Sequence, residues 1–346
     1  MSRTGLIVLA VVTALVVAGV AWLSADRDRE PEPPAGGPLV PGLADQVNDI
    51  EAVDIRAAEA GAHTRLRRER DRWRVLEKDG YEADFELVHD LLRDLAEGRR
   101  AEARTDNPAH FARLGVDGAD ESGGGVQVEF PGRDLAGLIV GNPDPTGRGR
   151  FVRLIGESRV WLSDRFLDIP ALPVDWLERS VMDIPLEDIR EIVIRHPDGD
   201  TVRLMGTGPE LNEFVLANVP DGREAGPAGR RNAVARGLSG LRLEDVRRHA
   251  PPLPDGAVGV LFTTRDGLNF VASLFEDEAG RWAHFTVSAE IEASADDEPA
   301  EDPAETQLLI DAVAVDARLS PWEFRIRDRR FEDLTVRLED LLAAPE

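Results

Sequence analysis

Six histidines have the broadest chemical potential in this sequence, because imidazole can serve as acid, base or metal ligand. They are His63, His89, His110, His196, His249 and His284. No two of them lie within five residues of each other, no HExxH motif is present, and no cysteine is available to complete a zinc site. We therefore expect separate strand or surface histidines, and no metal ligand among them.

The serine hydroxyl groups and the paired Glu and Asp carboxyl groups also form no recognisable catalytic motif. No serine lies in a Gly-x-Ser-x-Gly elbow, and this includes Ser158, Ser163 and Ser239, which lie in or beside predicted strands and a helical stretch. Glu-Asp pairs at 187–188, 244–245, 332–333 and 339–340 offer carboxylates for acid/base work. Each pair stands beside apolar residues, which is typical of solvated charges at the edge of a core. The sequence therefore predicts no catalytic residue.

One glycine-rich loop, residues 141–149 (GNPDPTGRG), invites comparison with phosphate-binding loops. It lacks their lysine, and it follows a predicted strand without leading into a helix, so no helix N-terminus reinforces its backbone amides. Asp144 is a conceivable calcium ligand, but the loop has too few acidic residues for an EF-hand-like pattern. We expect a long hairpin turn, with no cofactor-binding and no metal-binding residue.

Composition excludes several functional classes. Acidic residues outnumber basic ones 66 to 41, and the formal charge of −25 would repel phosphate backbones, so we expect no nucleic-acid partner. The absence of cysteine excludes disulfides. Aromatic residues make up only 5 % of the chain, so the core must consist mainly of Leu, Val, Ile and Ala. We expect the core to be anchored by tryptophans that lie in or beside predicted strands, namely Trp73, Trp161, Trp176, Trp282 and Trp322.

The N-terminus predicts a membrane segment. Residues 5–23 contain no charge and no proline, and as a helix they would extend about 28 Å, which matches a hydrocarbon core. Arg3 precedes this run, whereas the charges at 26–30 nearly cancel, so the N-terminus is expected in the cytoplasm. A cleaved signal peptide, with Gly19 and Ala21 near its cleavage site, is the competing interpretation. Both interpretations predict that the rest of the chain lies on the outer side of the membrane.

Distant segments match in the same order, which indicates an internal duplication. The motifs at 47–50 and 186–189 share an apolar, polar, Asp, apolar pattern and precede strand-like runs, and a third copy lies at 331–334. Residues 125–130 parallel 257–262, and each segment leads into a hairpin followed by a strand that begins with Gly-Arg-aromatic, at 149–151 and 280–282. Trp176 lies ten residues before the motif at 186–189, and Trp322 lies nine residues before the motif at 331–334. We therefore expect the two tryptophans in equivalent positions.

The predicted fold class is therefore α+β, with a duplicated unit of antiparallel hairpins packed with an amphipathic helix and preceded by one transmembrane helix. The first helix begins after Asp84, carries apolar residues at three- and four-residue steps, and stops at Gly98. Its counterpart covers 232–241, and a further helix is expected over 307–319. The expected domains are a transmembrane signal anchor at 1–25, a Pro/Gly-rich tether at 26–45, a first repeat at 46–183, and a second repeat at 184–346 that ends with a truncated third unit.

Several short motifs make the chain resemble the bacterial family called domain of unknown function 4340. They include Trp73-Arg74-Val75, Tyr81-Glu82-Ala83-Asp84, Arg113-Leu114-Gly115-Val116, Val140-Gly141-Asn142, the strand at 149–153 and Val160-Trp161-Leu162. Glu82 departs from the proline that the family usually has at that site. The resemblance extends over about 45–340. It implies a membrane-anchored extracytoplasmic protein related to gliding-motility-type auxiliary proteins that accompany ABC-2 transporters.

These observations favour a non-enzymatic accessory or scaffold protein. We expect it in the inner (cytoplasmic) membrane as a single-pass protein, anchored through residues 5–23, with most of the chain periplasmic or extracytoplasmic. Its expected partner is another envelope protein, for which an ABC-2 type transporter is the candidate, and no cofactor is expected. The alternatives are an envelope hydrolase whose site the sequence does not reveal and a small-ligand-binding protein with a largely apolar pocket between the two copies.

Overall fold

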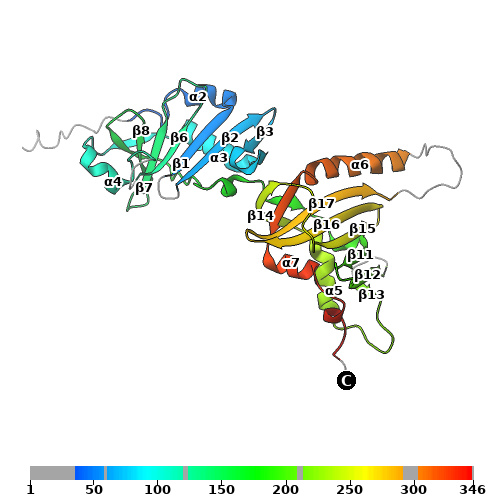
Figure 1. Ribbon diagram of the computed structural model, residues 1–346. Coiled ribbons are helices and arrows are strands. Elements are labelled where there is room, and N and C mark those ends of the chain that lie inside the picture. The colour runs from blue at the N-terminus through cyan, green and yellow to red at the C-terminus, as the bar shows by residue number, and fades with distance from the viewer. Residues whose placement is uncertain (1–35, 58–60, 120–123, 209–212, 291–302, 345–346) are drawn as a thin grey trace, which may run out of the picture. The chain divides into compact units, whose positions relative to one another are not determined.

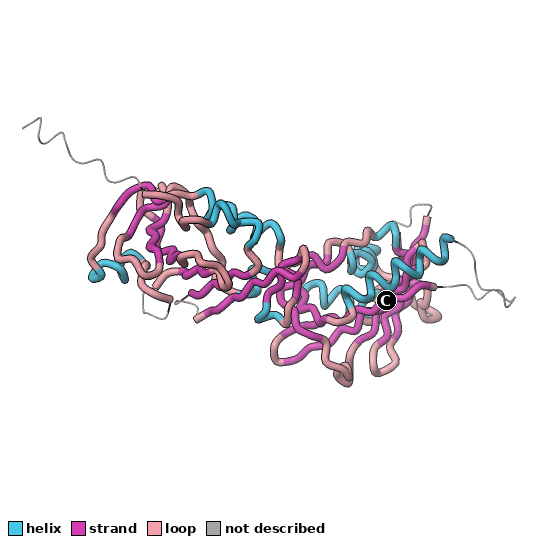
Figure 2. The backbone as a smooth tube through the Cα atoms, turned by 90° about the horizontal axis from the view of Figure 1, so that it is seen from above, coloured by secondary structure: helices cyan, strands magenta, loops and turns pink. Residues whose placement is uncertain are grey.

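The computed structural model describes residues 36–57, 61–119, 124–208, 213–290 and 303–344 (Figure 1). The chain forms two compact units. The first contains the described residues up to Arg65 together with Leu87–Ala171, and the second contains Leu66–Glu86 together with Leu172–Glu346. Strands predominate over helices in both units (Figure 2). The protein is therefore a mixed α+β protein with two large antiparallel sheets, as the alternating hairpin pattern predicted.

The first sheet contains nine strands in the order β4-β3-β2-β1-β6-β7-β8-β9-β5. In chain order these strands are β1 (Ala52–Ala57), β2 (Ala62–Glu69), β3 (Arg72–Val75), β4 (Tyr81–Glu82), β5 (Arg100–Ala103), β6 (Val126–Glu129), β7 (Leu138–Pro143), β8 (Arg150–Leu154) and β9 (Val160–Ser163). The predicted hairpin turn at 141–149 is confirmed, because it joins β7 to β8. A buried cluster of Phe111, Val116, Ile139 and Val160 forms part of the core of the first unit.

Helix α3 (Phe85–Glu97) confirms the predicted amphipathic helix. The Asp84 carboxylate accepts a hydrogen bond from the backbone N–H of Glu86 at 2.9 Å, which satisfies one of the free donors of the first turn. Val88, Leu91, Leu92 and Leu95 are buried, so one face of the helix packs into the protein. Short helices α2 (Leu43–Gln46) and α4 (Phe111–Leu114) also belong to the first unit.

The second sheet also has nine strands, in the order β10-β14-β18-β17-β16-β15-β11-β12-β13. In chain order they are β10 (Ser180–Met182), β11 (Ile189–Arg195), β12 (Thr201–Thr207), β13 (Glu213–Leu216), β14 (Leu241–Arg248), β15 (Val258–Thr264), β16 (Leu268–Asp277), β17 (Gly280–Ala289) and β18 (Trp322–Ile326). Helix α6 (Pro303–Leu319) packs against β17, while α5 (Ala228–Ala235) packs against β13 and α7 (Asp328–Leu334). Helix α6 confirms the helix predicted over 307–319. Helix α5, continued by the 3₁₀ turn η6 (Arg236–Leu238), begins and ends earlier in the chain than the element predicted over 232–241.

Eight strands follow the same order in both sheets. The series β3-β2-β1-β6-β7-β8-β9-β5 corresponds in connectivity to β13-β12-β11-β15-β16-β17-β18-β14. Helices α3 and α5 also occupy the same place along the chain. If the short β4 is left aside, α3 lies between β3 and β5, and α5 lies between their counterparts β13 and β14. The first two predicted opening motifs form the 3₁₀ turns η1 (Val47–Asp49) and η5 (Leu186–Asp188), which precede the equivalent strands β1 and β11.

Two details of the expected repeat differ from the structure. Trp322 lies in β18, whose counterpart is β9 with Trp161, whereas Trp176 ends the 3₁₀ turn η4 (Pro173–Trp176). Pairing Trp176 with Trp322 was therefore wrong, because their distance from a short motif does not determine their strand. The third motif, residues 331–334, lies within α7, and no strand follows it in the described part of the chain.

The predicted anchor, residues 5–23, lies outside the described residues. Among the residues that are described, no helix has both the length and the apolar character needed to cross a bilayer.

A substitution at Gly141 tests whether the backbone packs closely at the start of the glycine-rich turn. A Cβ atom at this position would lie 2.3 Å from the Leu114 carbonyl oxygen and 2.8 Å from that of Gly115, and backbone atoms cannot easily move aside. We expect Gly141→Ala to lower the free energy of unfolding by about 1–3 kcal/mol. Gly147 is the matched control, because its φ of 73° disfavours alanine but no atom lies within 4 Å of the added Cβ. Gly147→Ala should cost about 1 kcal/mol.

Both variants can be compared by urea unfolding of the full chain in detergent. A Gly141→Ala variant as stable as the wild type would contradict the close backbone approach.

Candidate binding cavity in the second unit

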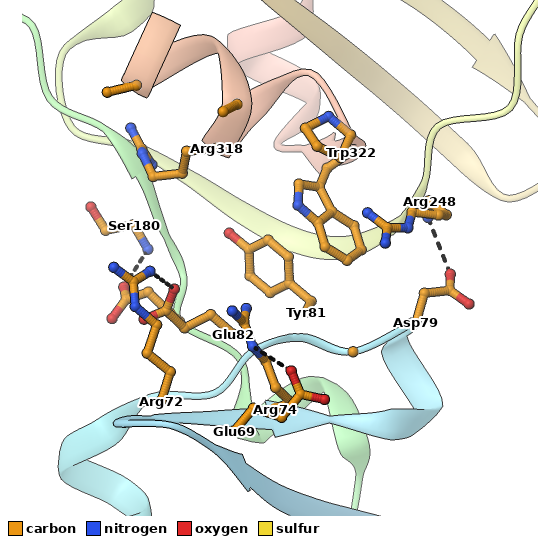
Figure 3. A pocket seen from close by; sticks show the side chains of 15 residues that line it. Glu69, Arg72, Arg74, Asp79, Tyr81, Glu82, Ser180, Arg248, Arg318 and Trp322 are labelled. Carbon is orange, nitrogen blue, oxygen red and sulfur yellow. Dashed lines mark hydrogen bonds and ion pairs between the residues drawn. The ribbon is translucent and has the colours of Figure 1, made fainter. Parts of the chain in front are cut away.

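The described part of the second unit contains a cavity of about 790 Å³ that we call the Tyr81 cavity (Figure 3). Its walls come from the β3–β4 hairpin, from β10 and the segment before it, from the end of β14, and from α6 with the turn into β18. All of its lining residues belong to the second unit, since the hairpin at 66–86 is part of that unit. No local sequence pattern indicates this cavity, because its walls are far apart in the chain.

Backbone hydrogen bonds hold the hairpin in place within the second unit. The Asp84 N–H donates to the Trp176 carbonyl at 2.8 Å, and the Glu178 N–H donates to the Glu82 carbonyl at 3.0 Å. Ala83 forms an isolated bridge with Leu177, so the segment 82–84 runs along 176–178. The sharp turn before β4 uses Asp79 and Gly80, both with positive φ, a conformation that favours glycine and tolerates aspartate. These contacts direct Tyr81 into the cavity.

Tyr81 and Trp322 form the aromatic wall of the cavity. Their rings meet edge to face, with centroids 5.0 Å apart and planes at 89°, a favourable geometry for two aromatic quadrupoles. The Arg248 guanidinium lies over the Trp322 ring at 4.6 Å, which is within the range of a cation–π contact. Burial raises the pKa of the Tyr81 hydroxyl, and the nearby Arg318 charge opposes this shift only in part. The hydroxyl therefore remains protonated at neutral pH and can donate a hydrogen bond.

Four arginines and four acidic residues line the cavity, namely Arg72, Arg74, Arg248, Arg318, Glu69, Asp79, Glu82 and Glu178. Arg72 pairs with Glu82 at 2.9 Å, and Arg74 with Glu69 at 3.8 Å. The remaining carboxylates accept backbone hydrogen bonds, Glu178 from Ser180 at 2.7 Å and Asp79 from Arg248 at 3.1 Å. The cavity is thus formally neutral in a chain that carries a charge of −25.

An exposed apolar surface on α6 continues from the cavity wall. Ala314 and Ala317 line the cavity, and Ile310 and Val313 lie on the same helical face with exposures of 56 % and 68 %. Leu309, beside them, is 42 % exposed. We call these five residues the α6 stripe. Exposed aliphatic side chains that cluster beside a cavity are typical of an interaction surface.

A second polar cluster joins three neighbouring strands of the second sheet. The order β14-β18-β17 and the antiparallel register place Arg247 opposite Glu323 and His284 opposite Glu323. Glu323 is only 4 % exposed; it accepts a hydrogen bond from Arg247 Nε at 2.6 Å, and its other oxygen lies 2.8 Å from His249 Nδ1. The His249 and His284 rings stack with centroids 3.9 Å apart. The expectation of separate histidines was therefore wrong for this pair.

The polar atoms of this cluster are largely satisfied by the protein itself. His284 Nε2 lies 2.9 Å from the Ser320 carbonyl oxygen, while the Ser320 hydroxyl bonds to Asp316. Arg247 also binds Asp277 at 2.8 Å and lies over the Trp282 ring at 4.0 Å. Within the described ranges, no side-chain hydroxyl is hydrogen-bonded to His249 or His284. The cluster resembles a buried structural network more than a nucleophile–base pair.

The other candidate residues remain apart. His63 lies in β2, His89 in α3 and His110 in η3 (Pro108–His110), while His196 is buried and bonds to the Val336 carbonyl oxygen. The Glu-Asp pairs do not converge on one site: 187–188 lie in η5, 244–245 in β14, 332–333 in α7 and 339–340 in η7 (Glu339–Leu341). The five tryptophans expected in the core are all buried.

Asp144 in the glycine-rich turn is also bound within the protein. Its carboxylate accepts hydrogen bonds from the Thr146 hydroxyl and N–H and lies near Arg148 and Arg104, and these contacts hold its pKa below the usual range. No cluster of three histidine, aspartate or glutamate side chains suited to a metal ion was found among the described residues.

The cluster around Glu323 should make stability depend on pH. Burial, aided by the neighbouring His249, lowers the pKa of His284 despite its bond to the Ser320 carbonyl. The unfolded chain, with an ordinary histidine pKa of about 6.5, therefore binds more protons than the folded protein as the pH falls. The stabilisation is full above about pH 6.5 and is lost below it, at no more than about 1.4 kcal/mol per pH unit.

We expect the free energy of unfolding, measured in urea between pH 7.5 and 5.5, to fall less steeply in His284→Asn than in the wild type. His110→Gln removes an exposed histidine and should leave the slope unchanged. Equal slopes for the wild type and His284→Asn would contradict this assignment.

Comparison of the sequence with profiles of protein families identifies the family of this chain. The profile described as Domain of unknown function (DUF4340) matches residues 73–257, more than half of the chain. The chain belongs to this family. The match begins in β3, includes the Tyr81-Glu82-Ala83-Asp84 segment at the cavity, and ends just before β15. The resemblance seen in the sequence motifs is thereby confirmed. No curated protein matches the chain, and no solved structure matches it either.

Proposed function

We propose that this protein is a non-enzymatic accessory or scaffold protein that binds another component of the cell envelope. The observation that carries this proposal is the exposed α6 stripe, which adjoins a cavity lined by arginine and aromatic side chains. Arginine, tyrosine and tryptophan are the residues most often found at the energetic centres of protein interfaces. A protein partner would cover the aliphatic side chains of α6 and use the cavity as an anchor point.

The cellular setting of the proposal comes from the sequence. The apolar run at 5–23 would anchor the chain in the inner membrane as a single-pass protein with its N-terminus in the cytoplasm. The tether expected at 26–45 would end before Leu39, because Leu39, Val40 and Leu43 are buried in the first unit. The folded units would then lie on the extracytoplasmic side. An ABC-2 type transporter is the partner implied by the resemblance to gliding-motility-type auxiliary proteins.

We also infer that the two halves of the chain arose by duplication, with repeats at 46–183 and 184–346. The shared order of eight strands and the 3₁₀ turns before β1 and β11 support this inference. The repeats do not coincide with the compact units, since Leu66–Glu86 belongs to the second unit. An experimental structure in which β6 and β15 fail to superpose, once β1 and β11 are aligned, would contradict the duplication.

The proposed function is tested by affinity purification of the full chain from detergent-solubilised membranes. A membrane protein recovered in stoichiometric amount, and lost when Val313 is replaced by aspartate, is the expected result. Val215→Asp is the matched control, because Val215 is 44 % exposed in β13 and is not part of the α6 stripe. Recovery of the protein without a membrane partner would overturn the proposal.

A further inference from the structure

Two of the cavity arginines differ from the others. Arg72 and Arg74 are paired with carboxylates, whereas Arg248 and Arg318 have no carboxylate within 4.0 Å in the part of the chain that the structure describes. Arg318 donates one hydrogen bond, from Nη1 to the Val181 carbonyl oxygen at 2.7 Å, which leaves its other N–H groups available. The Arg248 guanidinium rests on the Trp322 ring, which holds the charge without neutralising it.

The cavity therefore contains more unused donors than acceptors. Its carboxylates are engaged by Arg72, Arg74 and two backbone N–H groups. The Tyr81 hydroxyl has no hydrogen-bond partner among the described residues, and Figure 3 shows its ring between Arg318 on one side and Trp322 and Arg248 on the other. The Arg318 guanidinium lies on the Tyr81 side of the aromatic pair, and Arg248 lies beyond Trp322 in the lining of the same cavity. Arg318 and the Tyr81 phenol therefore form a site for an anionic group with few negative charges, to which Arg248 adds positive charge from a greater distance.

We propose that the Tyr81 cavity and the α6 stripe together bind a peptide segment of the partner in which apolar side chains are followed by a carboxylate. The aliphatic side chains would lie on Ile310 and Val313, and the carboxylate would enter the cavity toward Arg318 and the Tyr81 hydroxyl, with Arg248 adding positive charge from beyond Trp322. The distance along α6 from Ile310 to Ala317 is about 10 Å at 1.5 Å per residue, enough for about three residues of an extended peptide. This inference rests on the proposed function and specifies the chemistry of the partner.

The charges around the site favour a carboxylate over the phosphate of a lipid headgroup. Glu69, Asp79, Glu82 and Glu178 also line the cavity, so it suits one isolated negative charge, whereas the many phosphodiester groups of an anionic bilayer surface would be repelled together. A bilayer rich in anionic lipid would in addition face a chain with a net charge of −25. A carboxylate with an apolar neighbour matches both the two free arginines and the exposed aliphatic surface.

The test uses the full chain in detergent micelles and a phage-displayed library of random dodecapeptides. We expect selection to enrich peptides with two or three aliphatic residues followed by aspartate, glutamate or a free C-terminus. Binding of a selected peptide, measured by fluorescence anisotropy, should weaken about tenfold when its carboxylate is replaced by an amide and about tenfold in Arg318→Gln, with a smaller loss of about threefold in Arg248→Gln. Val313→Asp should weaken it by a similar factor.

Arg203→Gln is the matched control, because Arg203 is exposed in β12 and pairs with Glu191 away from the cavity. It should bind the peptides as the wild type does. Urea unfolding of each variant verifies that the second unit remains folded. No enriched peptide, enrichment of basic peptides, or binding that is equal in Arg248→Gln, Arg318→Gln and the wild type would overturn the proposal. So would binding of phosphatidylglycerol vesicles that depends on the two arginines while no peptide binds.

Failure of this inference is distinguishable from failure of the proposed function. If the wild type and the Arg248→Gln/Arg318→Gln double variant recover the same membrane protein in equal amounts, the accessory role stands and the carboxylate site is wrong. If peptides bind in the arginine-dependent manner but no stoichiometric membrane partner is recovered, the site stands and the proposed function fails.

Discussion

Glu323→Gln is expected to lower the free energy of unfolding by about 2–3 kcal/mol. Glu323 is almost fully buried in β18, and its two oxygens contact Arg247 Nε at 2.6 Å and His249 Nδ1 at 2.8 Å. Glutamine has nearly the same shape, but it is neutral and turns one acceptor oxygen into an NH₂ donor. The new NH₂ group would face either Arg247 Nε, which is always a donor, or His249 Nδ1, which would have to change tautomer to accept from it. Among the described residues Arg247 would keep Asp277 as its remaining charged partner.

The expected loss can be measured by urea unfolding of the full chain in detergent, with hydrogen exchange of peptides from β14, β17 and β18 to locate the effect. Glu339→Gln is a suitable control, because Glu339 pairs with Arg223 but its side chain is 71 % exposed. An exposed pair contributes about 0–1 kcal/mol. If the two glutamine variants were equally stable, Glu323 would have no special structural role.

Glu323→Gln should also change the acid limb of the stability profile. Although burial acts to raise it, hydrogen bonds from Arg247 and His249 lower the pKa of Glu323. This contribution is full above the unfolded pKa of about 4.3 and is lost as the pH falls below it. The variant has no such carboxylate, so its stability should decline less steeply than that of the wild type below about pH 4.3.

The cluster around Glu323 shows where sequence reasoning reached its limit. His249 and His284 are far apart in the chain, and only the order β14-β18-β17 brings them together beside Glu323. Long-range strand order depends on tertiary packing that a single sequence does not display. The Tyr81 cavity was unpredictable for the same reason, since its walls come from the 66–86 hairpin, β10, β14 and α6.

Features determined by neighbouring residues were predictable. The cap at Asp84 and the apolar spacing after it specified α3, and the turns between β15, β16 and β17 specified their hairpins. The orientation of α6 was not evident from its sequence, because apolar residues occur on more than one of its faces. Only Ala312 and Leu319 are buried, while Ile310 and Val313 face solvent.

Trp176→Ala is expected to lower the free energy of unfolding of the second unit by about 3–5 kcal/mol, the largest effect among these substitutions. The side chain is 1 % exposed, and its removal would leave a cavity that the short turn η4 cannot fill. The backbone at Trp176 accepts a hydrogen bond from Asp84, and the residues after it run along 82–84. Loss of the indole should therefore loosen the strand that carries Tyr81.

Leu172→Ala provides the control, because Leu172 lies in the same segment just before η4 and is 44 % exposed. A surface substitution of this kind should change stability by no more than about 0.5 kcal/mol. Urea unfolding measures the global loss, and faster hydrogen exchange at residues 81–84 in Trp176→Ala would show that the indole holds the Tyr81 strand. Unchanged exchange there, together with stability equal to that of Leu172→Ala, would mean that the cavity wall does not depend on Trp176.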